Sequence, residues 1–431
     1  MTHDTYDPDW PWRDARIDHA LYADLSEGEL RRRSVGQARR RAGAMLGMAV
    51  GDALGAPYEF GRSPGITLAG TSADLVGGGQ LGWARGEWTD DTAMAIPILR
   101  ARRDSEQRDL DAIVQSWRRW ELTSKDVGIQ TRDVLSRLTE ASTAADARIE
   151  AGAVHDARGR SGGNGSLMRT APAGLEMRLS PSGGFSSSRT VASIAHGARQ
   201  TSTLTHFDPD AGDACVLWSI MIHMATAHGV VDAEDAVRCL PRERRERWQG
   251  LLDEAAAAEP GDFPHNGWVV HALQAAWAAI HRAGFDLTDE STATPERFRL
   301  ALQHAINAGG DTDTVAAITG ALAGAFVGAD AIPLGWARRL HGWGDDGVVM
   351  DAGSMTSSTR ARRSCALPTR AAWCPRPCGR GDRSCQCIPS DFHSPDGSAA
   401  IVTGLSPRAG VPRQRCATSA PMMTSPNGYA C

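Results

Sequence analysis

The sequence predicts an all-α fold, a compact multi-helix domain followed by a disordered-looking C-terminal tail. Apolar residues recur at three- and four-residue steps through most of the first 350 residues, which is typical of helices that bury one side. Few stretches alternate polar and apolar residues with the period of two that marks a strand. Clusters of Gly, Ser and Pro at residues 61–82, 159–165 and 180–188 interrupt the helical pattern and predict loops.

Ten segments with this spacing predict helices, at residues 36–54, 91–103, 109–121, 128–140, 188–203, 211–228, 244–258, 267–283, 295–308 and 313–328. The last of them overlaps an uncharged run of 16 residues, from Thr314 to Ala329. A membrane helix needs roughly 20 strongly apolar residues, so this run predicts a buried central helix, and we expect no membrane partner. Gly320 and Gly324 would let a neighbouring helix approach it closely.

These patterns divide the chain into an N-terminal arm over residues 1–37, a helical domain over residues 38–350, and a low-pattern tail over residues 351–431. The tail is rich in Arg, Ser, Pro and Cys and has no sustained apolar period. Such a stretch is either disordered or coding sequence read in the wrong frame. Four of its cysteines lack the spacing of a standard zinc site, namely Cys374, Cys378, Cys385 and Cys387.

Charge and cysteine usage exclude several classes of protein. The chain of 431 residues carries a net charge of −5; the tail has ten arginines against four aspartates, so residues 1–350 carry −11. An acidic body argues against a nucleic-acid partner. Only Cys215 and Cys239 precede residue 350, and the N-terminus has no apolar signal segment. We therefore expect a cytoplasmic protein, and a monomer.

Two acidic clusters each precede a predicted helix. The first is Thr89-Asp90-Asp91-Thr92 and the second is Gly309-Gly310-Asp311-Thr312-Asp313-Thr314. Carboxylate and hydroxyl oxygens are the ligands that Mg²⁺ or Mn²⁺ prefers, and a pair of metal ions needs shared carboxylates of this kind. The alternative is two capped helices that never meet, because carboxylates at a helix start are also favoured by the helix dipole.

A glycine-rich loop, Ser161-Gly162-Gly163-Asn164-Gly165-Ser166-Leu167-Met168-Arg169, is the third feature. Glycines let backbone N–H groups approach a phosphate, and Ser166 and Arg169 could supplement them. The loop lacks the GK[ST] ending of a Walker loop, and no predicted strand precedes it as in a Rossmann fingerprint. Taken alone, it is equally an ordinary surface turn.

Together with Gly47-Met48-Ala49-Val50-Gly51-Asp52-Ala53-Leu54-Gly55-Ala56-Pro57-Tyr58-Glu59-Phe60, these features in this order resemble the ADP-ribosylglycohydrolase family. The resemblance runs from about Arg41 to Trp343. It implies an all-α enzyme that hydrolyses the glycosidic bond between ADP-ribose and a protein side chain, or a related ADP-ribosyl conjugate. The partner would then be an ADP-ribosylated protein, and the acceptor linkage stays open between arginine, serine and others.

The resemblance also implies a site with two Mg²⁺ ions, for which Mn²⁺ is an alternative. One side would consist of Thr89, Asp90 and Asp91, and the other of Asp311, Asp313 and Thr314. The ions would hold the ribose and a water beside the anomeric carbon. The Gly163–Met168 loop, with Asn164, Gly165, Ser166 and Met168, would then bind the pyrophosphate.

Three further residues have predicted roles beside alternatives. Glu59 is the candidate acid/base or substrate-positioning group, or else a rim glutamate; Asp90 and Asp91 could accept the proton instead. His206, in a Thr-His step that the family shares, would lie near the distal ribose or adenine, or else serve as a cap or core residue. Asp52 would be a buried hydrogen-bonding group that orders the site.

Two other functions remain open at this point. One is a catalytically silent member that binds ADP-ribose or is only structural, although all six predicted metal ligands are present. The other is a metal-dependent phosphohydrolase, since clustered aspartates beside a glycine loop also suit phosphoryl transfer. After Leu340-His341-Gly342-Trp343 the resemblance predicts a closing helix, and the low-pattern tail stands there instead.

Overall fold

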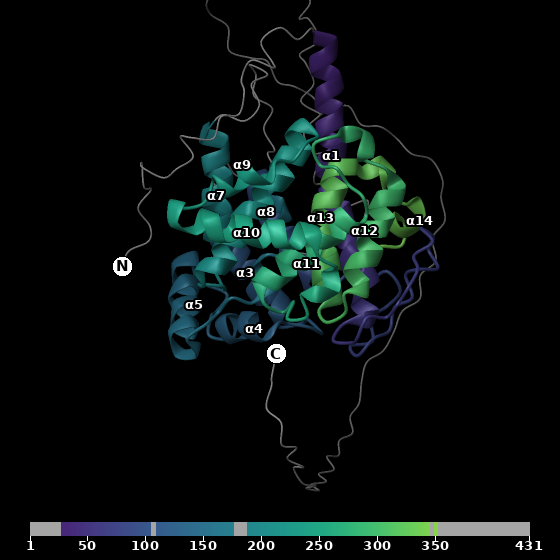
Figure 1. Cartoon of the computed structure of the whole chain (residues 1–431). Coiled ribbons are helices and arrows are strands. Elements are labelled where there is room, and N and C mark those ends of the chain that lie inside the picture. Colours follow the sequence, from purple (N-terminus) through teal and green to yellow (C-terminus); the bar gives the residue numbers. More distant parts are fainter. Residues whose placement is uncertain (1–26, 105–108, 176–187, 345–348, 352–431) are drawn as a thin grey trace, which may run out of the picture. The chain divides into compact units, whose positions relative to one another are not determined.

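The computed structural model describes residues 27–104, 109–175, 188–344 and 349–351 and confirms the all-α class (Figure 1). The chain divides into two compact units, residues 1–364 and residues 365–431, and every described residue lies in the first. The tail beyond residue 351, with its four closely spaced cysteines, lies outside the described residues. So does the predicted arm up to residue 26, whereas residues 27–37 already belong to the first helix.

The described helices are α1 (Glu27–Gly55), α2 (Asp90–Asp104), α3 (Leu110–Glu121), α4 (Ile129–Leu135), α5 (Ala144–Arg158), α6 (Ala171–Gly174), α7 (Ser188–Ser202), α8 (Pro209–His228), α9 (Ala233–Val237), α10 (Arg242–Ala257), α11 (Val269–Arg282), α12 (Pro295–Asn307), α13 (Thr312–Val327) and α14 (Leu334–Ala337). Short 3₁₀ turns η3 (Ala56–Tyr58), η4 (Asn164–Ser166), η5 (Pro260–Asp262), η6 (Glu290–Thr292) and η7 (Ala329–Ala331) connect them. Eight of the ten predicted helices agree to within two residues at each end. The first begins nine residues earlier than predicted, and the fourth ends five residues earlier.

Helix α5 was not among the predicted helices. Its buried positions are Ala144, Ala147, Ala151 and Val154, so its apolar face is small and its periodicity weak. The sequence nevertheless carries signals for both ends of this helix. Thr143 and Asp146 form a capping box, and Gly159 ends the helix in the left-handed conformation that glycine favours.

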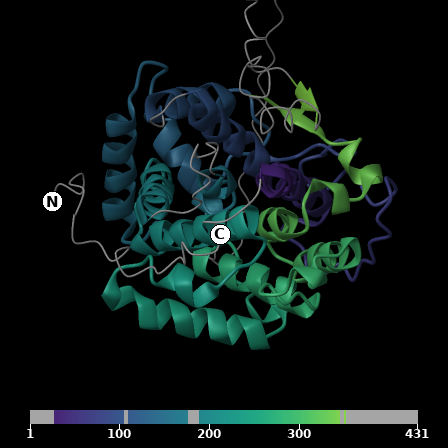
Figure 2. The ribbon, with the colours of Figure 1, turned by 90° about the horizontal axis from the view of Figure 1, so that it is seen from above.

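Helices α1 and α13 lie side by side, as Figures 1 and 2 both show, and the second half of α1 approaches α13 to backbone contact. Four glycines spaced four residues apart make this possible: Gly43, Gly47, Gly51 and Gly55. A Cβ on Gly47 would lie 2.2 Å from the carbonyl oxygen of Gly320, and one on Gly51 would lie 2.0 Å from that of Ala316. The close approach that Gly320 and Gly324 predicted is therefore confirmed, and it needs glycine on both helices.

Helix α13 is also the buried helix that its uncharged sequence predicted. Every residue from Thr312 to Val327 is buried. In the part of the chain that the structure describes, no helix has both the length and the apolar character for crossing a membrane.

Within the described residues, the segment after Leu340 forms a strand pair, and most of the stretch where the resemblance implied a closing helix lies outside them. Strand β1 (His341–Trp343) pairs antiparallel with β2 (Val349–Asp351). The backbone N–H of Trp88 donates to the His341 carbonyl at 2.9 Å, and its indole N–H donates to the Trp343 carbonyl at 3.2 Å. A Cβ on Gly342 would lie 2.3 Å from that indole. The start of α2, one residue after Thr89, is therefore anchored by the last described part of the domain.

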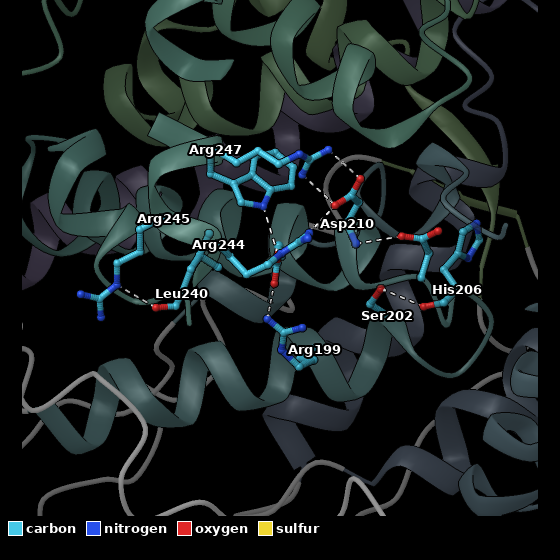
Figure 3. Close-up of polar contacts among 11 residues, drawn as sticks. Arg199, Ser202, His206, Asp210, Leu240, Arg244, Arg245 and Arg247 are labelled. Carbon is cyan, nitrogen blue, oxygen red and sulfur yellow. Dashed lines mark hydrogen bonds and ion pairs between the residues drawn. The ribbon is translucent and has the colours of Figure 1, made fainter. Parts of the chain in front are cut away.

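An ion-pair network joins α7, α8 and α10 (Figure 3). The buried Asp213 carboxylate accepts from Arg199 and from Arg244, each at 2.6 Å, while Asp210 accepts from both terminal nitrogens of Arg247 at 2.8 Å. Both aspartates lie in the first turns of α8. The network therefore fixes the start of α8, which directly follows the segment that carries His206.

Candidate active site

The first acidic cluster lies at the start of α2 and is held there by a carboxylate from α1. Asp52 Oδ1 accepts from the backbone N–H of Thr89 at 2.7 Å, and Oδ2 accepts from the N–H and hydroxyl of Thr92 at 3.0 and 2.6 Å. Asp52 is fully buried. The prediction of a buried hydrogen-bonding group is therefore confirmed, and these bonds hold the start of α2.

The second acidic cluster lies at the start of α13, after a turn that requires glycine. Gly309 and Gly310 both have φ of +73°, and a Cβ on Gly310 would lie 2.4 Å from the side-chain oxygen of Asn266. That oxygen accepts from the backbone N–H of Asp311 at 2.9 Å. Gly310 also forms an isolated bridge with Gly61. This bridge brings Glu59 beside the helix start.

The two helix starts meet, which excludes the alternative of two separate capped helices. Ligand atoms of Glu59, Asp311 and Asp313 all lie within 4.8 Å of one another, and α2 and α13 are in contact. Asp90 and Asp91 stand outside this tight group of three but interact electrostatically with Asp311. The group thus places Glu59, predicted as an acid/base, among the candidate metal-ligating carboxylates.

Burial and mutual repulsion raise the pKa values of these carboxyl groups. Loss of hydration raises the pKa of Asp90, Asp91 and Asp313 well above the usual range, and the neighbouring carboxylates raise it further. Burial, followed by the charge of Asp311, raises the pKa of Glu59 to about 9. The same burial raises the pKa of Asp52 to about 6, against the opposing hydrogen bonds of Thr92 and Thr89.

This donor set fits a hard divalent cation. The buried Asp91 Oδ1 has no hydrogen-bond partner in the described structure, while Asp91 Oδ2 accepts from the Thr89 hydroxyl at 3.0 Å. Asp311 precedes α13 without capping it through its side chain. Oxygen atoms that are buried, anionic and unpaired are stabilised by an ion such as Mg²⁺ or Mn²⁺. Thr314 lies in the same first turn, where its hydroxyl contacts the sulfur of Met168 at 3.8 Å.

The glycine loop adjoins the acidic cluster through one side chain. Asn164 Nδ2 donates to Asp311 Oδ2 at 2.7 Å and to the Asn266 carbonyl at 2.8 Å. The loop backbone is also paired with the segment before α11, since the Asn164 N–H donates to the Gly267 carbonyl at 3.1 Å and Gly163 bridges Trp268. The loop and the cluster therefore form one site.

Several loop side chains point into the protein, not along the loop surface. Ser166 is buried, and its hydroxyl pairs with Ser202 at 3.0 Å. Arg169 is fully buried, with its guanidinium 3.9 Å from the centre of the Trp117 ring. Burial lowers the pKa of Arg169 to about 9. The predicted contribution of Ser166 and Arg169 to substrate binding can therefore only be indirect in this arrangement.

His206 is buried against the glycine loop. A Cβ on Gly163 would lie 3.3 Å from its Nε2, and one on Gly165 would lie 3.1 Å from the same atom. Gly163 has an ordinary φ of −61°, so its backbone conformation does not require glycine, but the close imidazole favours one. His206 is therefore buried beside the loop, and its predicted place near the distal ribose or adenine stays a prediction.

Two residues of the site were missed by reasoning from sequence. Asp126 is among the charges that raise the pKa of Glu59 and Asp90, so it faces the acidic cluster. Asn266 bonds to both Asp311 and Gly309. Asp126 stands just before a predicted helix, as the two acidic clusters do, and this position was its only signal. Asn266 likewise stands directly before the predicted helix at residues 267–283, but its bonds to Asp311 and Gly309 depend on tertiary contacts that the sequence does not show.

The fold and the site define the class: an all-α enzyme whose carboxylate cluster can hold a metal ion, joined to a glycine loop. Within that class, the sequence model of the ADP-ribosylglycohydrolase family matches residues 34–363, and the chain belongs to this family. Members of the family are hydrolases of ADP-ribosyl conjugates, so the predicted family and enzyme class are confirmed.

Named relatives agree with this assignment. The chain is 28% identical to the ADP-ribosylarginine hydrolase Tri1 of Pseudomonas putida, over 70% of this chain and 74% of the relative. It is 29% identical to the ADP-ribosyl-[dinitrogen reductase] glycohydrolase of Rhodospirillum rubrum, over 70% and 90%. A solved structure, an ADP-ribosylglycohydrolase-related protein complex, aligns with a TM-score of 0.51 at 26% identity, covering 75% of this chain and 97% of that one.

Proposed function

We propose that this enzyme hydrolyses the glycosidic bond that links ADP-ribose to a protein side chain, with Mg²⁺ as the first candidate ion and Mn²⁺ as the second. The observation that carries the proposal is the hydrogen bond from Asn164 to Asp311. It joins a glycine loop suited to a diphosphate to an acidic cluster suited to a cation. ADP-ribose carries a diphosphate next to a ribose, so one ligand can occupy both parts.

The metal-ligating residues in this proposal are Thr89, Asp90 and Asp91 on one side and Asp311, Asp313 and Thr314 on the other. A bound divalent ion would supply orientation of the ribose hydroxyls and activation of water. Asp52 and Asn266 hold the two helix starts, so their hydrogen bonds fix the distance between the two sets of carboxylates. Such fixed charges favour the positive character that develops on the ribose as the bond breaks.

Glu59 is the residue to which we assign proton transfer. Asp90, Asp91 and Asp313 are buried, whereas Glu59 is only half-buried. A carboxyl group with a pKa of about 9 holds its proton at neutral pH and can donate it to a leaving side chain. A bound cation would lower that pKa, so in the metal-loaded site Glu59 would be suited to accepting a proton.

The test is release of free ADP-ribose from arginine-linked and serine-linked ADP-ribosylated proteins, with Mg²⁺ and with EDTA. We expect metal-dependent release from one of the two linkages. Asp311→Asn, which keeps an acceptor for Asn164, should lower turnover by about 10²-fold or more, because it removes a charge from the cluster. Glu59→Gln should lower turnover while ADP-ribose still binds.

The matched control is Asp330→Asn, which changes an exposed aspartate that pairs with Arg39 on the surface. It should leave turnover unchanged. Unaltered release by Asp311→Asn would overturn the metal assignment. Release of AMP or phosphate in place of ADP-ribose would identify a phosphohydrolase, and ADP-ribose binding without any release would identify a silent binder.

A further inference from the structure

A buried chain of three polar side chains lies behind the glycine loop. Arg169 Nη2 donates to the hydroxyl oxygen of Thr205 at 2.7 Å, and that oxygen is also 2.7 Å from His206 Nδ1. The guanidinium is held from its other side by the Trp117 ring and by the sulfur of Met94, at 3.3 Å from Nη1. All three polar residues are buried, so bulk water does not compete for these hydrogen bonds.

The direction of each hydrogen bond follows from the donors available. A guanidinium only donates, so the Thr205 oxygen must accept from Arg169. The single hydroxyl hydrogen of Thr205 then needs an acceptor, and His206 Nδ1 is the one within reach among the described residues. A buried hydroxyl hydrogen left without an acceptor is costly. Nδ1 is therefore the acceptor, and the ring proton is on Nε2.

The positive charge of Arg169 also favours the neutral form of the His206 ring. Burial, and then the nearby guanidinium, lower the pKa of His206 well below its usual range. The imidazole is therefore neutral, with one hydrogen. Nε2 has no hydrogen-bond partner among the described residues, and the space left by the missing side chains of Gly163 and Gly165 lies directly beside it.

We propose that Arg169 and Thr205 are positioning residues that hold His206 in the neutral Nε2–H form, so that the glycine loop presents this N–H to an oxygen of the bound ligand. The ligand, ADP-ribose, rests on the proposed function, whereas the relay itself does not. The loop thus gains a side-chain hydrogen-bond donor, His206 Nε2–H. The buried guanidinium of Arg169, acting through the Thr205 hydroxyl, determines which ring nitrogen carries the proton. This assigns Arg169 a role in binding although its guanidinium is fully buried.

The test compares two nearly isosteric substitutions of Thr205. Thr205→Val removes the hydroxyl, and Thr205→Ser keeps it. Long-range ¹H–¹⁵N correlation spectra of the ¹⁵N-histidine protein report which ring nitrogen carries the proton, and the His206→Gln spectrum assigns the signals. ADP-ribose affinity is measured on the same samples by calorimetry, and far-ultraviolet circular dichroism checks that each variant is folded.

We expect Nε2–H in the substrate-free wild type and in Thr205→Ser, and a loss of this preference in Thr205→Val. ADP-ribose should bind roughly tenfold more weakly to Thr205→Val, the effect of one misdirected hydrogen bond, with recovery in Thr205→Ser. An Nδ1–H or doubly protonated ring in the wild type would overturn the relay, as would an unchanged spectrum in Thr205→Val. Nε2–H without any ADP-ribose binding would support the relay and count against the proposed function, so the two failures are distinguishable.

Discussion

The two acidic helix starts are held by different means. At α2, one buried carboxylate, Asp52, accepts three hydrogen bonds from Thr89 and Thr92. At α13, a neutral amide from Asn266 bonds to the backbone, and the helix itself lies against glycines of α1: a Cβ on Gly55 would be 2.5 Å from the Cα of Asp313. Both arrangements depend on α1. This one helix therefore sets the separation between the two halves of the carboxylate cluster.

The largest loss of stability is expected from a substitution of Gly51, which tests whether α1 sets the separation of the two helix starts. Gly51→Ala would place a methyl group 2.0 Å from the carbonyl oxygen of Ala316, so α1 and α13 must separate. We expect the free energy of unfolding to fall by about 3 kcal/mol, although alanine favours helix by about 1 kcal/mol. Urea denaturation measures this change.

The control for Gly51 lies on the same helix. At Gly36 an added Cβ would meet only the end of the Arg40 side chain, at 3.7 Å. Gly36→Ala should be neutral or stabilising by up to about 1 kcal/mol. Equal stability of the two alanine variants would show that the glycine contact does not set the separation of the helices.

A smaller effect is expected from Asp52→Asn. The amide keeps one oxygen but turns an NH₂ group toward groups that donate, so at least one hydrogen bond to α2 is lost. We expect about 2 kcal/mol less stability and slower ADP-ribose release, since the α2 carboxylates lose their support. Thermal unfolding and turnover are measured together.

An exposed aspartate provides the comparison for that substitution. Asp232 caps α9 by accepting from the N–H of Asp235. Asparagine caps a helix about as well as aspartate, so Asp232→Asn should change stability by less than about 0.5 kcal/mol. If the two substitutions cost the same, Asp52 is an ordinary cap and not the support of the site.

The smallest expected effect is a loss of stability of the metal-free protein as the pH rises. It arises in the carboxylate cluster that the two helix starts share. The pKa of Glu59 is raised to about 9 from an ordinary value of 4.5, so without metal the folded state keeps a proton that the unfolded state has lost. Stability must then fall as pH rises through neutrality toward 9. Between pH 7 and 8 we expect a loss of roughly 1 kcal/mol for this group.

The pKa values of Asp90, Asp91 and Asp313 are raised in the same direction, so deprotonation of these neighbours adds to the decline, whereas the shifts of two other groups act outside this window. The depressed pKa of His206 acts below its ordinary value of 6.5, and that of Arg169 acts above about 9. Thermal melts in EDTA should show the decline, and Mg²⁺, but not NaCl of equal ionic strength, should reverse it. Metal-free stability that stays flat or rises from pH 7 to 8 would contradict the buried-carboxylate account.

The sequence predicted the fold class and most helices because their apolar faces are broad and regular. It did not predict α5, whose buried face is mainly alanine. For the site, the motifs supplied Asp90, Asp91, Asp311 and Asp313, since each cluster directly precedes a helix. They could not supply Asn266, or the side-chain direction of Arg169, because both depend on contacts between segments far apart in the chain.

The contact between Trp88 and strand β1 has a consequence for how the site is made. Residues that lie just before Thr89 acquire their final surroundings only when residues 341–343 are present. During synthesis, the contacts that hold the start of α2 can therefore be completed only after residues 341–343 have left the ribosome. Contacts between residues so distant in sequence form late and slowly. A chain that stops before residue 341 would therefore contain every candidate metal ligand but lack the strand that anchors the start of α2.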